Sequence, residues 1–73
     1  PGRMNMNEDA INMEIRRFLK KVGITSQREI EKALNAGFAS GKLSGGEQLE
    51  VNVRLEMPEI GLVHSLQEKI SVE

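Results

Sequence analysis

Nine consecutive residues in the second half of the chain alternate strictly between apolar and polar side chains. The apolar set is Leu49, Val51, Val53, Leu55 and Met57. Side chains of a β-strand point alternately to opposite faces, so this pattern predicts a strand with one buried face. Pro58 follows the pattern and ends it, because proline has no N–H to donate to a sheet. We therefore expect a strand over about residues 48–57.

A second extended segment, about residues 62–72, follows the turn-forming sequence Pro58-Glu59-Ile60-Gly61. Two strands joined by a short turn predict an antiparallel hairpin. The inward set of the second strand is expected to be His64, Leu66, Ile70 and Val72. Glu68 breaks this alternation, and a bulge or short turn near Gln67-Glu68 is expected to restore it.

The first half of the chain has helical periodicity. The apolar residues Ile11, Ile15, Phe18, Leu19 and Val22 recur at the spacing of an amphipathic helix, expected over about residues 8–22. Gly23 follows as a left-handed stop. Ser26 and Glu29 have the spacing of a capping box, which begins a second helix over about residues 27–40. Gly41 is expected to end that helix.

These elements predict an α+β fold in which two amphipathic helices pack on one antiparallel hairpin. We expect residues 4–73 to form a single domain. Residues 1–3 are typical of an expression scar, with the native start at Met4 or Met6.

Self-association is expected from the small size of the chain. A domain of 73 residues buries only about 60% of the surface of its unfolded chain and is marginal in stability. The sequence has no cysteine for a disulfide and one histidine, so we expect no metal site. A two-stranded sheet is also marginal in water. Pairing of the hairpin strands of two chains in a homodimer would remedy both weaknesses.

The segment around Gly23-Ile24-Thr25-Ser26 resembles the turn of a helix-turn-helix, and a hairpin after two helices is similar to part of a winged-helix domain. This resemblance implies nucleic-acid binding, which we keep as the alternative function. Three features argue against it. Leu19 is large for the tight helix crossing, Ile30 lies one residue too far from the turn, and too few residues precede Asn7 for a preceding helix.

Charge is distributed unevenly along the chain. Residues 1–42 carry a net charge of +3, and residues 43–73 carry a net charge of −4. Four basic residues of the helical half form the candidate surface for an unidentified protein partner: Arg16, Arg17, Lys20 and Arg28. Such charge asymmetry can favour self-association or a polar docking face, but it is more often typical of an ordinary solvated surface.

The sequence contains no constellation that indicates an enzyme. His64 and Ser65 are neighbours in a strand and point to opposite faces, so they cannot act as a base and nucleophile. We identify no catalytic, cofactor-binding or metal-binding residues. No segment approaches the run of about 18 apolar residues that a membrane helix needs, and no signal peptide is evident, so we expect a cytoplasmic protein.

The helical half also resembles a family of small proteobacterial proteins of about 65–75 residues that carry a domain of unknown function. The resemblance is carried by Met6-Asn7-Glu8-Asp9-Ala10-Ile11-Asn12-Met13, Ile15-Arg16-Arg17-Phe18-Leu19-Lys20 and Val22-Gly23-Ile24-Thr25-Ser26-Gln27-Arg28-Glu29-Ile30-Glu31-Lys32-Ala33. It implies a small stand-alone protein and assigns no site residues. Our interpretation is a non-enzymatic, homodimeric interaction module.

Overall fold

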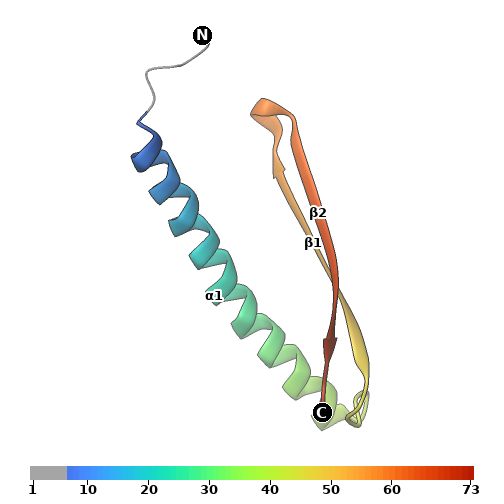
Figure 1. The fold of residues 1–73 in the computed structure, drawn as a ribbon. Helices are drawn as coiled ribbons and strands as arrows, with labels where there is room; N and C mark the ends of the chain where they lie inside the picture. Colours follow the sequence, from blue (N-terminus) through green and yellow to red (C-terminus); the bar gives the residue numbers. More distant parts are fainter. Residues whose placement is uncertain (1–6) are drawn as a thin grey trace. The chain divides into compact units, whose positions relative to one another are not determined.

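The computed structural model describes residues 7–73, in which one long helix is followed by a β-hairpin (Figure 1). Helix α1 spans Glu8–Ser40, strand β1 spans Gln48–Met57 and strand β2 spans Leu62–Ser71. A short 3-10 helix, η1, spans Pro58–Ile60. The chain divides between residues 39 and 40 into a helical unit and a hairpin unit. The predicted expression scar and the two predicted start residues lie outside the described residues.

The α+β class is confirmed, but the prediction of two helices was wrong. Helix α1 runs without interruption through residues 23–29. Gly23 does not adopt the positive φ that a left-handed helix stop requires. The Thr25 hydroxyl donates to the carbonyl oxygen of Lys21 at 2.8 Å, a bond that forms within a continuous helical turn. Glycine inside a helix costs only about 1 kcal/mol relative to alanine, so it weakens the helix without ending it.

The predicted capping box is also absent. The Glu29 carboxylate pairs with Lys32 Nζ at 3.4 Å instead of bonding back to Ser26. Gln27 Nε2 donates to Glu31 Oε2 at 3.1 Å. These contacts join residues three and four apart on the surface of one helix. The turn on which the helix-turn-helix interpretation depended is therefore absent from the described part of the chain.

Both ends of α1 have local explanations. Asn7 Oδ1 accepts a hydrogen bond from the Ala10 N–H at 3.1 Å, which caps the first turn, as expected for this residue type. Glu8 and Asp9 lie in that turn, where carboxylates complement the positive end of the helix dipole. Gly41 follows the last helical residue with φ of +84°, so the predicted stop at this glycine is confirmed.

The apolar side chains of α1 form two patches that lie at different angles around the helix. The first patch contains Ile11, Ile15, Phe18, Leu19 and Val22, and the second contains Ile30, Ala33, Leu34 and Phe38. A helix turns about 100° per residue, so Ile30 lies about 80° around the axis from Val22. Phe18 is 54% exposed, and most of the first patch is similarly exposed. The helical unit thus has no buried core within the described chain.

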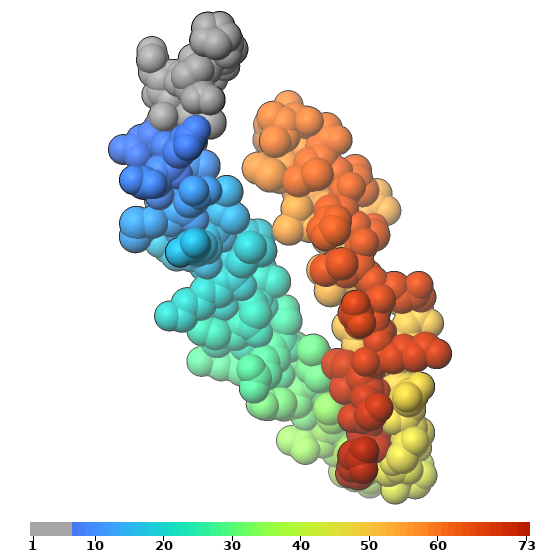
Figure 2. Space-filling view, in the orientation of Figure 1, coloured from blue at the N-terminus to red at the C-terminus, as the bar shows by residue number. Residues whose placement is uncertain are grey.

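The two strands pair over their full length, and the space-filling view shows them side by side (Figure 2). The register runs from Gln48 opposite Ser71 to Met57 opposite Leu62 without a break. The predicted strands at 48–57 and 62–72 are thus confirmed to within a residue or two. The predicted bulge near Gln67-Glu68 was wrong, because Glu68 pairs directly with Val51 and stays on the apolar face.

Glycines make both turns of the hairpin unit possible. Gly61 adopts φ of +72° and donates its N–H to the carbonyl of Pro58 at 3.2 Å, which closes the connection between the strands. Gly45 and Gly46 also have positive φ in the segment that leads into β1. Val72 lies beside this segment and is the one buried hydrophobic residue among those described, at 7% exposure.

Candidate functional site

The hairpin has one face made almost entirely of apolar side chains. Directly paired residues of two strands point to the same side, so the register defines this face. We call it the apolar face, and its members are Leu49, Val51, Val53, Leu55 and Met57 of β1 and Leu62, His64, Leu66, Glu68 and Ile70 of β2. Val53 and Leu66, a direct pair at the centre, are 45% and 49% exposed. A central apolar pair with half of its surface in water is unusual for a folded sheet.

Two polar residues interrupt the apolar face, and both lie on β2. His64 is opposite Leu55, and Glu68 is opposite Val51. Neither side chain forms a hydrogen bond or an ion pair with another residue of the described chain. They lie four residues apart, one on each side of Leu66. Their spacing is therefore symmetric about that leucine.

The opposite face of the hairpin is polar and its groups bond to one another. The Glu50 carboxylate accepts hydrogen bonds from Asn52 Nδ2 at 2.9 Å and from Gln67 Nε2 on the other strand at 2.7 Å. Both bonds lower the pKa of Glu50 below its ordinary value, and the bond from Asn52 is the larger cause. Arg54 Nε forms a hydrogen-bonded ion pair with the Glu56 carboxylate. Glu50, Arg54 and Glu56 thus have partners within the chain.

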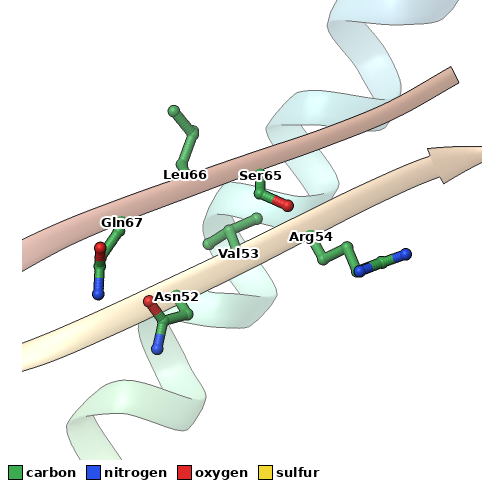
Figure 3. Close-up of a pocket in the computed structure, with 6 residues that line it drawn as sticks. All are labelled: Asn52, Val53, Arg54, Ser65, Leu66 and Gln67. Carbon is green, nitrogen blue, oxygen red and sulfur yellow. The ribbon is translucent and has the colours of Figure 1, made fainter.

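An open depression of about 530 Å³ lies at the middle of the hairpin (Figure 3). Six residues line it: Asn52, Val53, Arg54, Ser65, Leu66 and Gln67. Leu66 and Gln67 project from opposite sides of β2, so the depression bends around the strands and is not an enclosed cavity. Its lining has one charged group, Arg54, which is already paired with Glu56. This arrangement offers a surface for contact more readily than a pocket for a small molecule.

A carboxylate holds the segment before β1. Glu47 accepts hydrogen bonds from the backbone N–H groups of Ser44 and Gly45, both at 2.9 Å, and from the Ser44 hydroxyl at 3.2 Å. The bond from the Ser44 N–H is the main cause that lowers the pKa of Glu47. This contact was not predicted from the sequence, although a serine and two glycines before an acid favour such a turn.

The four basic residues predicted as a partner surface all lie on α1, but the helix distributes them over a broad area. Arg17 Nη1 pairs with Glu14 Oε2 at 3.1 Å. Arg28 lies eleven residues from Arg17, which places it about 20° around the axis and roughly 16 Å along it. Arg16 and Lys20 form a second row four residues apart. The side chains of Arg16, Lys20 and Arg28 have no ion pair with any described residue.

Within residues 7–73, no three His, Asp or Glu side chains are grouped closely enough to hold a metal ion. Helix α1 is not apolar enough over its length to cross a membrane. The surfaces that could contact a partner are the apolar face of the hairpin, the apolar patches of α1 and the basic residues of α1.

The fold and these surfaces define a small α+β protein in which a long amphipathic helix precedes a two-stranded hairpin. Over residues 6–73, the chain matches the family of unknown function DUF6494 and belongs to it. The predicted resemblance to an uncharacterised family is thereby confirmed. No curated protein and no solved structure matched the chain.

Proposed function

We propose that this chain is a small non-enzymatic interaction module that works as a homodimer assembled through its hairpin. The single observation behind the proposal is the exposed apolar face of a two-stranded sheet. Such a hairpin is marginally stable in water by itself, and a sheet of three or more strands is usually required. Strand addition from a second chain would supply the missing pairing.

The energetics favour covering the apolar face. Fully burying a Val, Leu or Met side chain contributes about 1.5–3 kcal/mol relative to exposure. Val53, Met57 and Leu66 are each nearly half exposed, so each leaves about 1 kcal/mol of this contribution unrealised. The first apolar patch of α1 is exposed to a similar degree. A strand added at the edge of the hairpin shields the apolar side chains beside it and would recover part of this contribution.

A second copy of the chain is the partner that the hairpin itself supports best. Each strand of a two-stranded sheet has one edge with unpaired backbone groups, and such an edge is a template for another strand. The chain supplies no disulfide or other covalent cross-link, because it contains no cysteine. In a two-fold symmetric dimer, the same strand edge of each hairpin pairs with its counterpart in the other copy.

The basic side of α1 is the surface that we propose for a further, acidic protein partner. Arg16, Lys20 and Arg28 are exposed, have no ion pair with any described residue and are spread over about 120° of the helix surface. Exposed arginines are effective in charged interfaces because each presents several donors. A cytoplasmic location, expected from the sequence, belongs to the same proposal.

Sedimentation velocity on two variants tests the homodimer. The Leu66→Lys substitution places a charge at the centre of the apolar face, whereas Gln67→Lys places the same charge on the polar face one residue further along. We expect the wild type and Gln67→Lys to sediment as a species of twice the 8.1 kDa chain mass at micromolar concentration. Leu66→Lys is expected to sediment as a monomer with its helical circular dichroism retained.

The outcome that overturns the proposal is a wild type that sediments as a monomer throughout the micromolar range. Equal weakening by the two variants would also contradict it, since a role for the apolar face requires that Leu66→Lys be the more damaging change.

A further inference from the structure

We propose that β2 is the edge through which two copies pair, antiparallel and about a two-fold axis at Leu66. This inference rests on the proposed homodimer and specifies its interface. It starts from an unexplained feature of the apolar face, the two unpaired polar residues His64 and Glu68. Their symmetric positions about Leu66 suggest that each is the partner of the other in a second chain.

Backbone geometry decides which residues of β2 can accept a new strand. The Val72 N–H donates to the carbonyl of Glu47 at 2.9 Å, so the backbone groups of Val72 point toward the β1 side. In an antiparallel ladder this direction alternates from residue to residue. Residues 64, 66, 68 and 70 therefore direct their backbone groups to β1. Residues 63, 65, 67 and 69 direct theirs to the free edge.

A two-fold axis at Leu66 satisfies this alternation. It sets Ser65 opposite the partner's Gln67, and both residues direct their backbone groups to the free edge, so they can exchange hydrogen bonds. Leu66 then meets the partner's Leu66 in a non-hydrogen-bonded pair. Side chains approach most closely in such pairs, with Cα atoms about 4.5 Å apart.

The same axis makes the side chains complementary. His64 comes opposite the partner's Glu68, and symmetry repeats this contact on the other side of the axis. The imidazole can donate a hydrogen bond to the carboxylate, and a protonated imidazole adds an ionic attraction. Leu62 comes opposite the partner's Ile70. Both polar residues of the apolar face thereby gain a polar partner, and both leucines of β2 gain an apolar one.

Other registers of the β2 edge, and pairing through the free edge of β1, bring less complementary side chains opposite one another. An axis at Gln67 places Leu66 opposite the partner's Glu68, which buries a carboxylate against an apolar side chain. Pairing of β1 edges about Val53 places Glu50 opposite the partner's Glu56, and like charges directly opposite are destabilising. In other β1 registers the charged side chains gain little, because Glu50 and Arg54 already have partners within the chain.

Cysteine cross-linking tests the register, because this chain has no cysteine of its own. The Leu66→Cys variant places two thiols across the proposed axis. The Val53→Cys variant is a matched control, since Val53 is the direct partner of Leu66, lies on the same face and is similarly exposed. Under mild oxidation, we expect Leu66→Cys to form a disulfide-linked dimer at least tenfold faster than Val53→Cys.

A charge exchange tests the contact between His64 and the partner's Glu68. The His64→Glu variant creates two pairs of like charges, and we expect it to weaken self-association by roughly tenfold. Adding Glu68→Lys to this variant restores opposite charges across the axis, and we expect the original association to return. In the Glu68→Lys variant alone, the lysine faces the partner's imidazole, and we expect association to weaken less than in His64→Glu.

The results separate this inference from the proposed function. A dimeric wild type combined with equal or faster cross-linking of Val53→Cys overturns the β2 edge but keeps the homodimer. A double variant that associates no better than His64→Glu overturns the side-chain pairing. A monomeric wild type overturns both proposals.

Discussion

Glu68 of β2 lies directly opposite Val51 of β1, so a carboxylate interrupts an otherwise apolar row. A bulge would have turned this side chain to the polar face, but the unbroken ladder keeps it among valines and leucines. An exposed carboxylate at this position costs little in the single chain, because water solvates it. Covering the face without a partner for the carboxylate would be costly. Glu68 therefore limits which partners the hairpin can accept.

Replacement of Gly23 by alanine tests the continuity of α1. Gly23 is an interior helical residue without positive φ, and a Cβ added there meets no atom within 4 Å. We expect Gly23→Ala to raise the free energy of unfolding by about 1 kcal/mol, because alanine is the better helix former. Urea unfolding followed at 222 nm, at one protein concentration, measures the change.

The matched control for this prediction is Gly61→Ala. Gly61 has φ of +72°, which an alanine adopts only at a cost of about 1 kcal/mol or more. The two substitutions should therefore change stability in opposite directions. A destabilised Gly23→Ala would indicate a left-handed glycine and a break between two helices, contrary to the structure.

The turn before β1 is expected to loosen in acid. Hydrogen bonds from Ser44 and Gly45 lower the pKa of Glu47, so its contribution to stability is complete above the ordinary glutamate pKa. That contribution is lost as the pH falls through the lowered pKa of the folded state. The amide proton shifts of Ser44 and Gly45, followed by NMR during an acid titration, should report this transition. A midpoint at or above the ordinary value would contradict the hydrogen bonds of this turn.

The hydrogen bonds of the polar face predict which substitutions raise the pKa of Glu50 most. Asn52 is the main cause of its lowered pKa, and Gln67 contributes less. We expect Asn52→Ala to raise the pKa of Glu50 more than Gln67→Ala does, and the double variant to raise it furthest. Carboxyl carbon shifts in a pH titration measure all three values. No change in Gln67→Ala would contradict the hydrogen bond between the strands.

Binding of duplex DNA is expected to be absent or weak. The continuous helix contains no turn that could present a recognition helix to the major groove. Glu14 and Glu29 also pair with two of the basic residues of α1, Arg17 and Lys32. We expect no mobility shift of duplex DNA at low salt and micromolar protein. A salt-dependent shift that Arg28→Glu abolishes would instead support a nucleic-acid interface on the basic side of α1.

The hairpin could be predicted from the sequence because its signals are local. Strict alternation over residues 49–57 is specific to a half-buried strand, and Pro58 and Gly61 mark the connection. The position of Glu68 could not be predicted in the same way. Its charge suggested a bulge, whereas continuous pairing of the strands outweighs the preference of one side chain.

The break predicted at Gly23 failed for a different reason. Gly23, Ser26 and Glu29 are all typical of helix ends, and each forms its end-specific contacts only if the helix stops. Propagation of a helix adds a hydrogen bond per residue, and starting a second helix requires a costly nucleus. One glycine, without a proline, does not outweigh that cost. The predicted partner surface on α1 remains a prediction.

The most direct measurement of the central claim is an isotope-filtered NOE experiment on a mixture of labelled and unlabelled chains. Such spectra detect only contacts between two copies. We expect intermolecular NOEs from side chains of β2, strongest for the methyl groups of Leu66, and none between β1 of one copy and β1 of the other. A sample without intermolecular NOEs, with the diffusion coefficient of a monomer at the same concentration, would contradict the claim that the hairpin joins two chains.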